Sequence, residues 1–197
     1  MKAKENNTLK ELKHIVKNHD NYEENLKAVF QDANAKFNDR ISAGLLLTGF
    51  ELGIRSGDLC GLFKDCLRYD PQGMPYVNLK SADGISIHNA PFVIYCNPEL
   101  EQRLKELLKL REQCPYAEES PFLYVLDKKR EDIATKPVNQ SWLSMKFKQF
   151  CGQDAKLKML RLYHVWKLWT SGMPVEEIAR QLGHKFRNSP YFRYRKK

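Results

Sequence analysis

The chain has 197 residues, of which 42% are hydrophobic, and it carries a formal net charge of +9 at pH 7. This length predicts one globular domain of ordinary core size. No apolar run is as long as a membrane span, and the first residues do not resemble a secretory signal, so the sequence predicts a cytoplasmic protein without a membrane partner. The five cysteines show no CxxC spacing, which argues against a disulfide framework and against a metal site.

The positive charge is concentrated near the C-terminus. Residues 141–197 contain 13 Lys and Arg but only 3 Asp and Glu, whereas the first 140 residues are close to neutral. A basic third on a near-neutral body predicts a polyanionic partner, with nucleic acid favoured over a merely solvated basic face.

The first half of the chain reads as helical. Apolar residues recur at helical spacing in two consecutive stretches, residues 8–19 and 22–37. Residues 39–53 are apolar nearly all round, which predicts a buried helix. A short helix follows, with Ser56 as its expected cap and Asp58 in its first turn.

The pattern then changes to a β segment before helices resume. Residues 76–80 and 84–89 alternate apolar and polar on either side of "SADG", which predicts two strands joined by a turn. The next helix should begin at Asn97 as its cap, with Pro98 in the first helical position. Three more helices are expected, in residues 139–152, 157–172 and 174–184. The predicted fold class is mainly α with a small antiparallel β-sheet.

A few polar residues stand out from this pattern. Arg55 lies between a fully apolar helix and the next one, where it should either pair with Asp58 or face an anion. Arg161 lies inside another apolar helix, one turn after Lys158. A guanidinium suits phosphate because its planar fork donates in pairs to two oxygens, although a structural ion pair is the simpler role for each arginine taken alone.

Three further residues are ambiguous when taken singly. Lys80, in the predicted hairpin, could be an ordinary solvated strand lysine, and His184 could cap the end of a helix. Tyr194 stands between Arg193 and Arg195, either as surface decoration on a basic tail or as a nucleophile beside a negative group.

Taken in order, these elements resemble the catalytic domain of the tyrosine recombinase (phage integrase) family. The resemblance covers roughly residues 25–195 and consists of "GIRSGD", a hairpin lysine, "KMLR", "LGH" and a trailing tyrosine. The chain departs from the family pattern at Lys158, usually a histidine, and at Leu162, where many relatives have histidine. The family position of the tyrosine, nine residues after His184, falls on Arg193. Tyr194, one residue further, is the favoured nucleophile because the arginine before it resembles the family's pattern, and Tyr191, two residues short, is the alternative.

The resemblance implies cleavage and rejoining of double-stranded DNA through a covalent 3′-phosphotyrosyl intermediate, with no metal and no cofactor. The arginines would bind the phosphate, Lys80 would protonate the leaving 5′ oxygen, and Asp58 would steady the site. The implied catalytic residues are Arg55, Lys80, Lys158, Arg161, His184 and Tyr194. The expected DNA contacts are Lys185, Arg187, Arg193 and Arg195.

The resemblance also divides the chain. Residues 1–24 are expected to form an N-terminal helix or leader, without the family's core-binding domain, and residues 25–197 the catalytic domain. A monomer is expected in free solution and a homotetramer on DNA.

One alternative remains open from the sequence. Residues 174–193 also fit a helix-turn-helix whose basic second half enters a DNA groove, which would make the protein a non-catalytic DNA-binding module. That interpretation leaves Arg55, Asp58 and Lys80 without a role.

Overall fold

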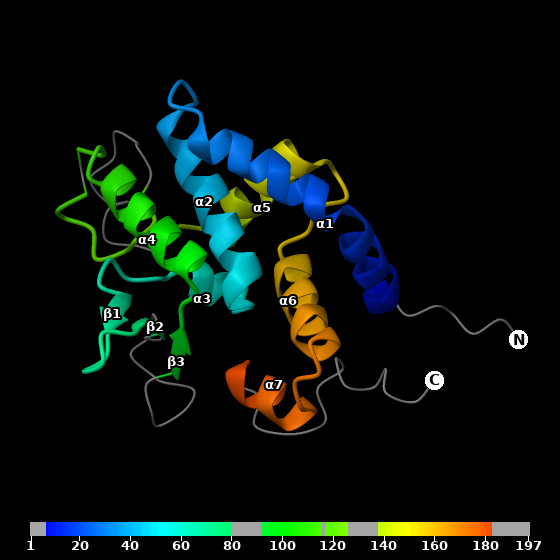
Figure 1. The fold of residues 1–197 in the computed structure, drawn as a ribbon. Helices are drawn as coiled ribbons and strands as arrows, with labels where there is room; N and C mark the ends of the chain where they lie inside the picture. The colour runs from blue at the N-terminus through cyan, green and yellow to red at the C-terminus, as the bar shows by residue number, and fades with distance from the viewer. Residues whose placement is uncertain (1–6, 80–91, 116, 126–137, 183–197) are drawn as a thin grey trace, which may run out of the picture.

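The computed structural model describes residues 7–79, 92–115, 117–125 and 138–182. Helices dominate these ranges, and a small sheet is inserted among them (Figure 1). The helices are α1 (Asn7–Gln31), α2 (Phe37–Leu52), α3 (Ser56–Cys60), α4 (Pro98–Arg111), α5 (Gln140–Cys151), α6 (Lys158–Thr170) and α7 (Val175–Gln181). The strands are β1 (Leu67–Tyr69), β2 (Pro75–Leu79) and β3 (Phe92–Tyr95). The predicted fold class is confirmed.

Helix α2 is the centre of the core. It packs against α1, α4, α5 and α6, which surround it in Figure 1. This explains why its sequence is apolar nearly all round: Leu45 and Leu46 are completely buried, as the sequence predicts. Gly49 allows α6 to approach closely, because a Cβ there would lie 2.8 Å from a methyl carbon of Leu160.

Helix α1 is one continuous helix rather than the two that the sequence suggests. Its buried positions follow one stripe, in which Ile15 and Leu26 are fully buried. The helix ends at Gln31, and residues 32–36 make the turn into α2. The expected boundary between residues 24 and 25 therefore falls inside α1.

The turn from α2 into α3 differs by one residue from the expected cap. Arg55 is the N-cap of α3, and Ser56, predicted as the cap, is the first helical residue. The Ser56 hydroxyl instead donates a hydrogen bond to Oε1 of Gln140 at 2.6 Å. Because Ser56 bonds to α5, it ties the start of α3 to that helix.

The sheet is antiparallel with the order β1-β2-β3. Val77 is fully buried on the core side, whereas Tyr95 on the other face is 60% exposed. The strand expected at residues 76–80 is confirmed up to Leu79, and β1 and β3 were not predicted. The strand expected at residues 84–89 lies outside the described residues.

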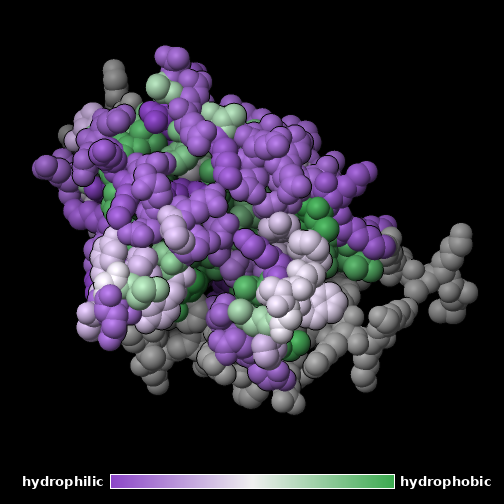
Figure 2. Space-filling view, viewed as in Figure 1, coloured by the Kyte–Doolittle hydropathy of each residue, from purple (hydrophilic) through white to green (hydrophobic). Residues whose placement is uncertain are grey.

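The remaining helices follow the expected pattern. Asn97 caps α4 by accepting a hydrogen bond from the backbone N–H of Leu100 at 2.7 Å, and Pro98 begins the helix. Gly152 ends α5 with a φ of 97°. Figure 2 shows a hydrophilic surface over α1 and α4, and residues of intermediate hydropathy over α6 and the sheet. None of the described helices has the length and hydropathy of a membrane span.

Candidate functional site

Arg161 joins three segments that are far apart in the sequence. Its side chain is buried, and Nη1 donates to the carbonyl oxygen of Gly53 at 3.2 Å while Nη2 donates to that of Leu182 at 2.9 Å. Gly53 ends α2, and Leu182 directly follows α7. The guanidinium therefore fixes the α2–α3 junction and the end of α7 on either side of itself.

This arrangement brings Arg161 close to Arg55. Gly53 and Arg55 are two residues apart, so their Cα atoms lie no more than about 7 Å from each other. Leu182 is also the first residue of the "LGH" sequence. Three of the motifs singled out in the sequence thus reach the same region of the fold, at one end of α6.

Arg55 is exposed, and within the described residues it makes no ion pair and no side-chain hydrogen bond. The alternative that it pairs with Asp58 is not realised, although Asp58 lies half-buried in α3. The role in which Arg55 faces an anion stays a prediction.

Tight packing behind the junction determines the path of the chain into α3. Gly53 has a φ of 60°, a left-handed conformation that glycine adopts without strain. Its N–H donates to the carbonyl of Gly49 at 3.0 Å, which closes α2. A Cβ at position 53 would lie only 2.8 Å from the Cβ of His164. His164, on α6, therefore leaves no room for any residue but glycine.

Gly53→Ala is expected to destabilise the protein by about 3 kcal/mol, since left-handed strain and a steric clash with His164 add together. Gly73→Ala is the matched control. Gly73 also has a positive φ of 81°, but no atom lies within 4 Å of its would-be Cβ, so only the strain of about 1 kcal/mol remains. Urea unfolding of both variants measures the difference, and equal destabilisation would contradict the proposed clash.

His164 is held neutral by burial. Its pKa is lowered to about 4, mainly by desolvation and to a smaller extent by the nearby Lys167 and Arg161, against the hydrogen bond with the Phe50 carbonyl, which raises it. Its Nδ1 lies 3.2 Å from that carbonyl oxygen, so Nδ1 carries the proton and donates it. A neutral histidine here avoids placing a second buried positive charge beside Arg161.

The protein is expected to lose about 2 kcal/mol of stability between pH 7 and pH 5 through His164. The folded-state pKa is depressed, so in this range the unfolded chain binds a proton that the folded one does not. Protonation therefore favours unfolding as the pH falls below the ordinary value near 6.5. Urea titrations at both pH values measure the loss, and His164→Gln should remove most of it. An equal pH dependence in the variant would assign the effect to other groups.

Lys158 pairs with an acidic residue in this structure. Its Nζ lies 2.7 Å from Oε2 of Glu11, a residue of α1. Lys156 donates a hydrogen bond to the other oxygen of the same carboxylate at 3.1 Å. Both lysine side chains are about half exposed, and Glu11 is nearly buried.

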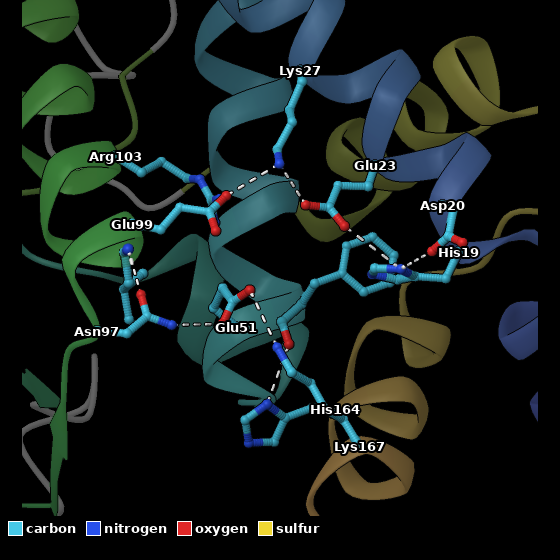
Figure 3. A network of polar contacts seen from close by, with 12 residues as sticks. His19, Asp20, Glu23, Lys27, Glu51, Asn97, Glu99, Arg103, His164 and Lys167 are labelled. Carbon is cyan, nitrogen blue, oxygen red and sulfur yellow. Dashed lines mark hydrogen bonds and ion pairs between the residues drawn. The ribbon is translucent and has the colours of Figure 1, made fainter.

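A separate polar network lies among α1, α2, α4 and the second half of α6 (Figure 3). Lys27 lies between Glu23 and Glu99, at 2.7 and 3.2 Å, and so links α1 to α4. Glu51 of α2 pairs with Lys167 of α6 at 3.7 Å. These charges are paired with one another, which is the pattern of a structural network that holds four helices together.

Several expected site residues lie outside the described residues: Lys80, His184, Lys185, Arg187, Tyr191, Arg193, Tyr194 and Arg195. Lys80 directly follows β2, and His184 follows Leu182 by two positions. The second half of the alternative helix-turn-helix also lies outside the described residues.

The sequence analysis did not single out Glu11 or His164. Both interrupt an apolar helical stripe, which is the signal that could have identified them. In the described part of the chain, no group of three or more His, Cys, Asp and Glu side chains could hold a metal ion.

Comparisons with known proteins identify the fold. No protein-family model and no curated protein matches the sequence. Among solved structures, the XerH site-specific recombinase bound to difH substrate in a pre-cleavage complex superposes with a TM-score of 0.62 at 17% identity, over 85% of this chain and 45% of that one. XerH in a post-cleavage complex with palindromic difH gives 0.62 at 18% identity, over 92% and 46%. XerA recombinase gives 0.55 at 17% identity, over 83% and 53%.

The chain has a tyrosine recombinase catalytic-domain-like fold. The likeness that the sequence motifs indicate is thus confirmed at the level of the fold. The chain spans about half the length of these recombinases, so their activity does not transfer with the fold.

Proposed function

We propose that this recombinase-like protein acts in the cytoplasm in site-specific DNA recombination or integration, cleaving and rejoining double-stranded DNA. The observation that carries the proposal is the position of Arg161. Its guanidinium is fixed between the junction that bears Arg55 and the residue that begins the "LGH" sequence. Two arginines at one end of α6 provide the charge that a phosphodiester undergoing attack requires.

The proposed reaction is a transesterification. The phenolic oxygen of Tyr194 attacks phosphorus, forms the bond to the 3′ phosphate and releases its proton to solvent water. The bond from phosphorus to the 5′ oxygen breaks, and Lys80 supplies the proton that the departing oxygen takes up. Attack by the freed 5′ hydroxyl reverses these steps and rejoins the strand.

The other site residues support this chemistry. Arg55 and Arg161 contact the two non-bridging oxygens and offset the charge that grows as phosphorus becomes five-coordinate. His184 and Lys158 orient the phosphate, and Asp58 steadies Arg55 or His184. The basic residues Lys185, Arg187, Arg193 and Arg195 contact the DNA backbone. Strand exchange requires several active sites, so a homotetramer on DNA is part of the proposal.

Covalent trapping tests the reaction. A duplex with a nick close to the cleavage position releases a short 5′ fragment after attack, and this loss prevents rejoining. The full chain is expected to give a protein–DNA adduct on a denaturing gel. Tyr194→Phe should abolish the adduct, and Tyr191→Phe should leave it at the wild-type level, because each change removes one hydroxyl and keeps the ring.

Three results would revise the account in different ways. An adduct that survives Tyr194→Phe and vanishes with Tyr191→Phe moves the nucleophile to Tyr191. DNA binding without any adduct supports the non-catalytic binding module. The absence of both binding and adduct contradicts a role on DNA.

A further inference from the structure

Glu11 occupies a position where an apolar residue is expected. It begins the buried stripe of α1, one turn before Ile15, and only 8% of its surface is exposed. A carboxylate in such a position needs strong partners, because removing a charge from water is costly unless the charge is paired. The fold supplies two partners, both about 145 positions further along the chain.

Lys156 and Lys158 hold the two oxygens of this carboxylate. The Nζ–O distances are 3.1 Å to Oε1 and 2.7 Å to Oε2, respectively. These lysines lower the pKa of Glu11 against the effect of burial, so the carboxylate is ionised at neutral pH. One acid between two lysines leaves a net positive charge at the surface.

The start of α6 adds to the positive potential of this cluster. The first turn of α6 contains no acidic residue, and its N-cap, Leu157, offers no side-chain hydrogen bond. The partial positive charge of the helix N-terminus is therefore countered by neither of these local groups. Lys156, Lys158 and this helix end together form an anion site, and the carboxylate of Glu11 fills it.

The anion site adjoins the candidate functional site. Lys158 and Arg161 are three residues apart in one helix, a spacing at which side chains are neighbours. An ammonium has three N–H donors, and both lysine side chains are more than half exposed, so a phosphate can approach them from solvent. Glu11 would then face that phosphate from the protein side.

We propose that Glu11 competes with a DNA backbone phosphodiester for Lys156 and Lys158, so that helix α1 weakens the binding of DNA beside the Arg161 site. This inference rests on the proposed function and adds to it a phosphate site and the residue that limits its strength. Lysines held by Glu11 contribute little to DNA affinity, and lysines released from it contribute fully.

The test compares the DNA affinity of two variants of the full chain with the same change in charge. Glu11→Gln removes the competing carboxylate. Glu24→Gln removes a charge from an exposed residue of α1 for which no ion pair is found in the described part of the chain. Fluorescence anisotropy with a labelled duplex gives the affinity of each variant at several salt concentrations.

Glu11→Gln is expected to tighten binding by about tenfold near 0.1 M salt and to steepen the salt dependence by about one to two phosphate contacts. Glu24→Gln should change the affinity by less than about twofold, since its charge is exposed and screened. In a variant that already carries Lys156→Met and Lys158→Met, Glu11→Gln should change the DNA affinity no more than Glu24→Gln does.

Equal effects of Glu11→Gln and Glu24→Gln in the otherwise unchanged chain would overturn the inference, as would weaker binding by Glu11→Gln. Either result would leave Glu11 as a structural ion pair. Failure of every variant and of the wild type to bind DNA would instead contradict the proposed function. Glu11→Met, of similar volume and without polar atoms, repeats the comparison if Glu11→Gln does not fold.

Discussion

Arg55→Ala is expected to slow DNA cleavage by about 10²- to 10³-fold while changing the free energy of unfolding by no more than about 0.5 kcal/mol. The two effects separate because Arg55 is exposed and, within the described residues, bonds to no other side chain. Its removal leaves no buried group unpaired, and the transition state loses a charged donor. Replacing an arginine that only decorates the surface would leave the cleavage rate unchanged as well as the stability.

Single-turnover trapping with the nicked duplex measures the rate, and urea unfolding measures the stability. Lys64→Ala is the matched control, because Lys64 is also exposed, lies nine residues from Arg55 and loses the same charge. It should retain cleavage within about threefold, since a distant exposed charge acts only through a screened field. Equal losses of cleavage rate in the two variants would mean that Arg55 contributes only to the general positive charge of the protein.

Arg161→Met is expected to abolish cleavage and also to destabilise the fold by about 3 kcal/mol. Both effects follow from burial: the side chain holds the carbonyls of Gly53 and Leu182, and methionine leaves both without this donor. Arg161→Lys should recover part of the stability but little of the cleavage. An ammonium keeps the charge but cannot span two carbonyls and a phosphate in the plane of a guanidinium.

Urea unfolding and covalent trapping again provide the measurements. Arg68→Met is the control for stability, because Arg68 is partly exposed and pairs only locally with Asp65 at 2.6 Å within the described residues. Its expected cost is below about 1 kcal/mol. Full cleavage by Arg161→Met would contradict the proposed phosphate contact, whatever its effect on stability.

The fold could be predicted from the sequence to a considerable extent. Local sequence patterns predict the cap at Asn97, the buried helix α2 and the helices after residue 139, because local chemistry determines where these helices form. Strands β1 and β3 were missed because each is three or four residues long, too short to show alternation. The break expected within α1 does not occur. His19 and Tyr22 lie on the buried stripe, so the same face of the helix stays packed across the expected break.

The site could be predicted only as an order of motifs. The motif order singles out Arg55 and Arg161, and the contact of Arg161 with Gly53 depends on the packing of α6 against α2. The pairing of Glu11 with Lys158 joins two residues that are far apart in the sequence, and no local period indicates such a pair. The neutrality of His164 likewise results from burial, which only the assembled fold establishes.

The most direct test of the account uses DNA in which the phosphate at the cleavage position is replaced by an uncharged methylphosphonate. If Arg55 neutralises a non-bridging oxygen of that phosphate, the neutral linkage makes the arginine dispensable. The account predicts that Arg55→Ala forms the covalent adduct with methylphosphonate DNA at a rate within about tenfold of the wild type on the same DNA, despite its large defect on ordinary DNA. A defect of equal size on both substrates, or no adduct from the wild type on either, would contradict the proposal that this site cleaves DNA.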